Sequence, residues 1–238
     1  MKKKMKLSRY TLFSILLITF IILVNFPINR NIIKISIILM GIALYIYSIY
    51  ILWKKRPLRY LIIGIAPVII FISMLSGPPV SGENLTNTYI DCLKKYEGTT
   101  YLWGGENRFG IDCSGLVRKG LMDAYTKVGF SNFSPQYFRK ALYLWFYDSS
   151  AQALRDGYRN YTTTIIKDIT LNSLDHSMLR LGDIMVTEDG VHTMAYIGNS
   201  QWIQADPGKH KVIIESAPSS SNTWYNARAR IVRWNVLN

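Results

Sequence analysis

Acidic residues are absent from the first third of the chain. None of the 15 Asp and Glu residues lies before Glu83, whereas 11 of the 28 Lys and Arg residues do. The first part therefore has a net charge of +11, and the remainder contributes only +2 to the total of +13. Short basic clusters between long apolar runs are typical of a membrane protein and not of a uniform nucleic-acid-binding face. We therefore expect a lipid bilayer, and no nucleic acid, as a partner.

Residues that hold metals or build disulfide frameworks are also scarce, because the chain has only two cysteines and three histidines. Cys92 and Cys113 allow at most one disulfide, and we expect Cys92 to be a buried helix residue. A His/Cys cluster with zinc spacing and an Asp-rich calcium loop are both missing, so we expect no metal and no cofactor. Ser114 lacks the Gly-x-Ser-x-Gly frame of a serine hydrolase.

Three apolar runs dominate the part of the chain before Glu83. They predict about three transmembrane helices, at residues 10–28, 32–53 and 58–76, and the apolar part of the third is close to the lower length limit for a span. The first run could be a signal peptide, but it lacks a small-x-small cleavage site and a second run follows at once, which favours a retained anchor. Basic residues concentrate before the first run and between the second and third. This asymmetry predicts a cytoplasmic N-terminus and a final domain on the outer side.

A turn-rich linker, Ser76-Gly-Pro-Pro-Val-Ser-Gly, ends the apolar region. It divides the chain into a membrane anchor, residues 1–82, and a domain, residues 83–238, which is large enough for its own core. Apolar residues at helical spacing predict helices in the first part of this domain. Residues 131–177 are expected to hold one or two further helices, whose positions the pattern does not indicate. Five strands are then expected, at 183–187, 193–197, 201–205, 211–215 and 229–234. This order predicts an α+β domain with helices packed on an antiparallel meander.

The segment from Tyr101 to Val117 is the strongest candidate for a catalytic site. Its glycines form a tight loop that leads into a helix starting at Cys113. The unpaired N–H groups and positive dipole of a helix start favour an anion, so we expect a lowered pKa and thiolate character for Cys113. The backbone N–H of Cys113 is a candidate oxyanion donor.

A cysteine nucleophile needs a base and a group that orients the base. Of the three histidines, only His192 opens a predicted strand within the domain, and Gln204 on the next strand could accept a hydrogen bond from its ring. Side chains alternate along a strand, so the two residues share a face only if the connecting turn at 198–200 has three residues or a bulge. We therefore predict one of these two turns.

Four blocks of the sequence resemble the NlpC/P60 family of cell-wall cysteine peptidases, in the family's order. The blocks are Tyr101-Leu-Trp-Gly-Gly, Ile111-Asp-Cys-Ser-Gly-Leu-Val, Leu181-Gly-Asp-Ile-Met-Val, and Val191-His192 running into Tyr196-Ile-Gly-Asn. The resemblance implies a papain-like α+β fold and a catalytic set of Cys113, His192 and Gln204. The family most often has His at the third place, so Gln204 departs from the commoner choice.

The resemblance also implies the substrate and its contacts. Family members typically cleave peptidoglycan stem peptides between γ-linked D-glutamate and the following diamino acid. Together with the three apolar runs, we therefore expect a multi-pass bacterial membrane protein with an external catalytic domain. Tyr101, Asp112 and Ser114 would line the substrate site, although Asp112 alone would also make a good helix cap. The alternative is a weak or inactive domain that binds wall peptides or a protein partner. The sequence carries no signal for an oligomeric state.

Overall fold

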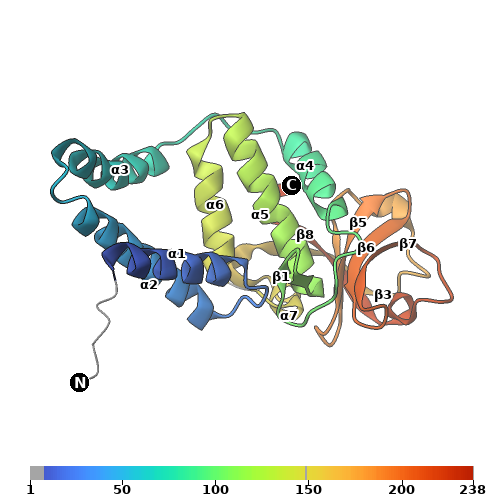
Figure 1. Ribbon diagram of the computed structural model, residues 1–238. Coiled ribbons are helices and arrows are strands. Elements are labelled where there is room, and N and C mark those ends of the chain that lie inside the picture. The colour runs from blue at the N-terminus through green and yellow to red at the C-terminus, as the bar shows by residue number, and fades with distance from the viewer. Residues whose placement is uncertain (1–7, 148, 238) are drawn as a thin grey trace, which may run out of the picture.

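The computed structural model describes residues 8–147 and 149–237. Three apolar helices come first and extend away from an α+β domain, as Figure 1 shows. They are α1 (Arg9–Asn25), α2 (Asn31–Ile51) and α3 (Arg56–Met74). Among the described residues, only α2 and α3 are long and apolar enough to cross a membrane, judged by length and composition.

The prediction of about three membrane helices is therefore corrected to two candidates. Helix α1 has only 17 residues because the chain leaves the helix at Phe26, immediately before Pro27. Proline lacks a backbone N–H and disfavours a helical conformation at the residue before it. Residues 26–28, which the sequence analysis counted in the first span, instead form the start of a connector between α1 and α2. Helix α3 is longer than its apolar run indicated, and Pro67 is accommodated inside it.

The first helix after the three apolar helices is α4 (Gly82–Lys94). Ser81 caps this helix, since its side chain accepts a hydrogen bond from the N–H of Asn84. Helix α5 (Cys113–Ser131) starts at the predicted cysteine. The segment that the sequence pattern left open contains helices α6 (Pro135–Phe146) and α7 (Ala151–Arg155), and the strand β3 (Thr162–Ile169).

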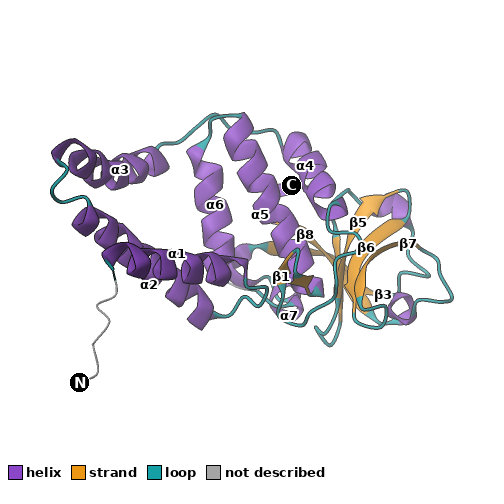
Figure 2. Ribbon diagram, viewed as in Figure 1, coloured by secondary structure: helices purple, strands orange, loops and turns teal. Residues whose placement is uncertain are grey.

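A six-stranded antiparallel sheet forms the other half of the domain (Figure 2). Its remaining strands are β4 (Ile184–Thr187), β5 (Thr193–Gly198), β6 (Gln201–Asp206), β7 (Lys211–Ser216) and β8 (Ala229–Trp234). The order β3-β8-β4-β5-β6-β7 confirms a meander from β4 to β7, but β8 returns across the sheet to pair with β4. The last strand therefore does not continue the meander, and β3, which the pattern missed, pairs beside it.

Two hydrophobic clusters cover the two faces of the sheet. Helices α4 and α5 pack with one face of the sheet, and this larger cluster includes Leu116, Val117 and Ile203. The second cluster, with Trp202 and Tyr225, covers the other face. Strand β5 is buried on both faces, so its first residue, Thr193, and the preceding His192 are held in a rigid, water-poor setting. That rigidity positions the candidate site.

Candidate active site

The loop before α5 holds Cys113 at the first position of the helix. A short two-stranded ribbon, β1 (Glu106–Asn107) and β2 (Gly110–Ile111), leads into it. Gly104 has a φ of +76°, which favours glycine, and a Cβ on Gly115 would come within 2.2 Å of the Gly105 carbonyl oxygen. The loop can therefore approach the start of α5 closely only because these positions have no side chain.

Asp112 is the N-cap residue of α5, the structural role that the sequence analysis gave as an alternative to substrate binding. Its carboxylate accepts hydrogen bonds from the N–H of Gly115 at 2.6 Å and of Gly104 at 2.8 Å. The Ser114 hydroxyl donates to the same carboxylate at 3.0 Å. Burial raises the pKa of Asp112, and these hydrogen bonds oppose the rise. The carboxylate thus fixes both the loop and the helix start on which the cysteine lies.

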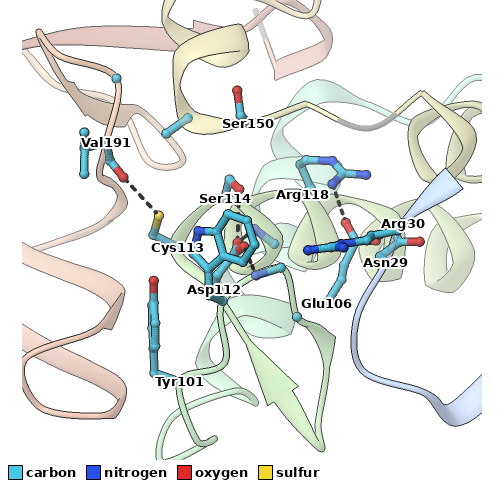
Figure 3. A pocket seen from close by; sticks show the side chains of 16 residues that line it. Asn29, Arg30, Tyr101, Glu106, Asp112, Cys113, Ser114, Arg118, Ser150 and Val191 are labelled. Atoms are coloured by element: carbon cyan, nitrogen blue, oxygen red, sulfur yellow. Dashed lines mark hydrogen bonds and ion pairs between the residues drawn. The ribbon is translucent and has the colours of Figure 1, made fainter.

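A cavity of about 430 Å³ opens in front of Cys113. Figure 3 shows Tyr101 with its hydroxyl pointing towards the cysteine, and Asp112 and Ser114 beside it. The Cys113 thiol donates to the Val191 carbonyl at 3.8 Å, which joins the helix start to the residue before His192. The structure therefore brings four of the predicted site residues to one cavity.

His192 and Gln204 are not among the residues that line this cavity. Both are buried, and His192 Nε2 lies 2.7 Å from Gln204 Oε1. A carbonyl oxygen only accepts, so Nε2 carries the proton and Nδ1 keeps its lone pair. Gln204 Nε2 is also buried and has no hydrogen-bond partner among the described residues.

The predicted turn explains why these two side chains meet. Strand β5 pairs with β6 through Ala195 and Ile203, and the register shifts between Tyr196 and Gly198. Ile197 is therefore the extra residue of a bulge, which confirms that alternative and excludes the pairing of Ile197 with Gln201. The bulge keeps Gln204 on the same face as His192, as the analysis of register required.

The protonation states differ from the sequence-based expectation. Burial raises the pKa of the Cys113 thiol to about 12, with a further rise from Asp112. Backbone N–H groups at the helix start act in the opposite direction but do not overcome burial. The expected lowered pKa of Cys113 is therefore wrong for this structure. Burial also lowers the pKa of His192 to about 4, although the hydrogen bond that its ring donates to Gln204 acts in the opposite direction, so both groups are neutral near pH 7.

The sequence analysis missed several residues around the site. The Trp224 ring stacks on His192, with centroids 4.2 Å apart and planes at 20°. Arg118 and Glu106 form a buried ion pair at 2.8 Å on the cavity wall. Trp103 and two residues of the α1–α2 connector, Asn29 and Arg30, also line the cavity. Trp103 lies inside a quoted block, but nothing in a single sequence indicates that a membrane connector reaches the site.

Both cysteines are free, and Cys92 is buried in α4 as expected. His210 is exposed, and the His176 ring accepts a hydrogen bond from the Trp202 indole. Neither histidine lines the cavity. The described residues contain no group of three or more His, Cys, Asp or Glu side chains that could hold a metal ion.

Several solved structures resemble part of this chain at low sequence identity. The NlpC2 protein of Trichomonas vaginalis is 20% identical with a TM-score of 0.42, covering 65% of this chain and 48% of its own. An NlpC/P60 family protein of Bacillus cereus is 19% identical with a TM-score of 0.39, covering 66% and 41%. The peptidoglycan hydrolase RipB of Mycobacterium tuberculosis is 17% identical with a TM-score of 0.41, covering 66% and 67%.

The chain spans about half the length of the first of these structures. No curated protein sequence matches the chain. The decisive comparison is with protein families, where the sequence model of the NlpC/P60 family matches residues 98–233, more than half of the chain and the whole segment that holds Cys113, His192 and Gln204. The chain therefore belongs to the NlpC/P60 family.

Proposed function

We propose that the chain is a membrane-anchored cysteine peptidase that hydrolyses peptidoglycan stem peptides at the bond between γ-D-glutamate and the diamino acid. Family membership supports a cell-wall peptidase. The observation that carries the proposal is the buried pair of His192 and Gln204, with His192 directly after Val191, whose carbonyl accepts a hydrogen bond from the Cys113 thiol at the start of α5. A base with a fixed tautomer next to a nucleophile is the arrangement that acyl transfer requires.

The neutral resting state sets the order of the proton transfers. His192 Nδ1 takes the thiol proton as Cys113 Sγ attacks the amide carbonyl, and the backbone N–H of Cys113 donates to the developing oxyanion. The imidazolium then protonates the leaving amine, and the C–N bond breaks to leave a thioester. Neutral His192 next accepts a proton from water as the water oxygen attacks the thioester carbonyl. The C–S bond then breaks, and the imidazolium returns that proton to Cys113 Sγ. Gln204 keeps Nε2 protonated throughout.

Tyr101, Asp112 and Ser114 are proposed to bind the substrate. All three line the cavity with Cys113, and the buried Asp112 carboxylate would attract the free amine of a short peptide. The Tyr101 hydroxyl stays protonated, because burial raises its pKa to about 12. It can therefore donate a hydrogen bond to a substrate carbonyl.

The proposed membrane arrangement rests on where the connectors lie. The α1–α2 connector contacts the domain, since the Asn29 N–H donates to the Gly104 carbonyl at 2.9 Å. The chain leaves α3 for the same domain, so the α2–α3 connector lies at the opposite ends of these helices (Figure 1). That connector holds Lys54, Lys55 and Arg56, which favour the cytoplasm. The domain is then external, and the anchor crosses the membrane twice, through α2 and α3.

The first test uses the full chain in detergent with a defined muropeptide, followed by mass spectrometry. We expect cleavage after the γ-D-glutamyl residue and no cleavage by Cys113→Ala. An uncleaved muropeptide that still binds would instead support the second candidate, a binding module. The neutral and buried thiol, only 7% exposed, is the observation that keeps this second candidate open.

A further inference from the structure

The connector between α1 and α2 forms part of the wall of the active-site cavity. Asn29 and Arg30 line that cavity together with Trp103 and Cys113, as Figure 3 shows for the labelled members. Both connector residues lie outside residues 98–233, which the family sequence model matches. This wall is therefore an addition to the family fold, supplied by the apolar N-terminal part of the chain.

Backbone hydrogen bonds fix the connector to the loop before α5. The Asn29 N–H donates to the Gly104 carbonyl, and the Glu106 N–H donates to the Pro27 carbonyl, both at 2.9 Å. Ile28 pairs with Gly105 as an antiparallel bridge between these two bonds. The connector thus adds a short strand-like edge to the glycine loop that positions Cys113.

Buried charged side chains also stabilise the contact between the connector and the domain. The Asn29 amide donates to the Glu106 carboxylate, which also pairs with Arg118. One turn into α2, Lys34 is 1% exposed, and its ammonium donates to the Phe146 carbonyl at 3.4 Å. Polar groups are buried only where they are satisfied, so the connector and the start of α2 are built into the domain.

Arg30 is the connector residue whose charge faces the cavity without an acidic partner. Its guanidinium lies 5.9 Å from the ring centroid of Trp103, and the Trp103 side chain is 72% exposed. Within the described ranges 8–147 and 149–237, Arg30 forms no ion pair, whereas Arg118 on the same wall is paired with Glu106. A guanidinium held over an indole keeps its fork of donors available for a planar carboxylate.

We propose that Arg30, supported by Trp103, binds a free carboxylate of the stem peptide in the active-site cavity. This proposal rests on the proposed function for its substrate. A γ-linked D-glutamyl residue leaves its own α-carboxylate free close to the bond that is cleaved, and the peptide also has a C-terminal carboxylate. The shared chemistry is a peptide carboxylate, and the specificity it confers depends on the membrane anchor being present.

The test measures binding with the full chain in lipid nanodiscs, in the Cys113→Ala background so that no peptide is consumed. The probes are L-Ala-γ-D-Glu-L-Lys-D-Ala, the same peptide with an α-carboxamide on its glutamyl residue, and the same peptide with a C-terminal amide. Arg30→Gln removes the charge, Arg30→Lys keeps it, and Lys54→Gln in the α2–α3 connector is the matched control.

We expect Arg30→Gln to weaken binding of the parent peptide roughly tenfold to a hundredfold, the range for a hydrogen-bonded charge. Arg30→Lys should lose less and Lys54→Gln nothing. If Arg30→Gln does not weaken binding of one of the two amidated peptides any further, the carboxylate missing from that peptide is the one that Arg30 contacts. Equal binding by Arg30→Gln and Lys54→Gln, an equal loss on all three peptides, or no binding of the parent peptide would each overturn the proposal.

Cleavage assays with the chain that retains Cys113 separate this proposal from the peptidase proposal. If the peptide binds through Arg30 but is never cut, the subsite stands and the peptidase proposal fails. If the peptide is cut and Arg30→Gln changes neither KM nor binding, the peptidase stands and the subsite fails.

Discussion

His192 Nε2 and Gln204 Oε1 lie 2.7 Å apart, with His192 directly before β5, Gln204 on the neighbouring strand β6, and a bulge at Ile197 between them. An uncharged acceptor sets the tautomer of the imidazole without raising its pKa as a carboxylate would. The pair thus keeps His192 neutral and aligned, which suits a base whose partner thiol is also neutral at rest.

Replacing Gln204 tests that role directly. Gln204→Ala should lower kcat on the order of tenfold with KM unchanged, because the ring loses one neutral hydrogen bond and its fixed tautomer. Gln204→Glu should instead raise the pKa of His192 and move the acidic limb of the kcat/KM profile to higher pH. A pH profile of all three proteins on one muropeptide measures both effects. An unmoved acidic limb in Gln204→Glu would show that residue 204 does not contact the working base.

Trp224 is a second positioning residue for His192. Its ring stacks at 4.2 Å, so it restricts rotation of the imidazole and shields it from water. We expect Trp224→Ala to lower kcat about tenfold, since aromatic pairs contribute on the order of 1 kcal/mol. Trp224→Phe should retain most of the activity, because a smaller ring can still stack. Steady-state kinetics with one muropeptide distinguishes the two variants, and equal kcat for Trp224→Ala and the unmodified chain would exclude the role.

The thiol of Cys113 should react as an ordinary protonated thiol in the free protein. Its pKa of about 12 predicts that alkylation by iodoacetamide accelerates with pH well beyond pH 9. The measurement uses a Cys92→Ala chain, so that Cys113 is the single thiol. A rate that is already at its plateau by pH 7 would demonstrate a resting thiolate, as the helix-start argument alone predicted. Mass spectrometry of the labelled peptide reports the rate.

The sequence predicted the components of the site better than their electrostatics. Periodicity and the Gly-rich loop located Cys113 at a helix start, and the parity of strand positions located Gln204 relative to His192. Both arguments depend on local geometry, which a single sequence encodes. The pKa of Cys113 depends on how deeply the thiol is buried, which is decided by tertiary packing, so the local argument gave the wrong direction.

The same distinction explains the errors in the fold. Strand β8 matches its predicted bounds, yet its place between β3 and β4 required knowledge of non-local pairing. Strand β3 has irregular register with β8, and although its burial alternates over residues 162–167, Thr and Ile occupy both the exposed and the less exposed positions, so its sequence carried no clear period of two. The contact of Asn29 with Glu106 joins residues 77 positions apart and has no sequence signature.

Buried, neutral His192 should make the fold less stable in acid. Its pKa is about 4 in the folded chain against an ordinary 6.5, so between these values the unfolded state binds more protons. Stability therefore falls as the pH is lowered from 6.5 to 4, by about 3 kcal/mol in total from this residue. Thermal unfolding of the chain in detergent at several pH values measures the slope. His192→Gln should flatten it, and the exposed His210→Gln should not; identical slopes for both variants would contradict the argument.

Asp112 combines a cap with a proposed substrate contact, and two variants separate them. Asp112→Ala removes the acceptor for the Gly104 and Gly115 N–H groups, so it should cost about 2 kcal/mol of unfolding free energy. Asp112→Asn keeps an acceptor oxygen for the Gly115 N–H, but it turns a donor NH2 towards the Gly104 N–H and removes the charge. We therefore expect it to unfold between the temperatures of Asp112→Ala and the unmodified chain while raising KM for a peptide with a free amine, and not for the same peptide N-acetylated. Thermal unfolding and kinetics on the peptide pair test both parts, and equal KM changes on the two peptides would leave Asp112 with the cap alone.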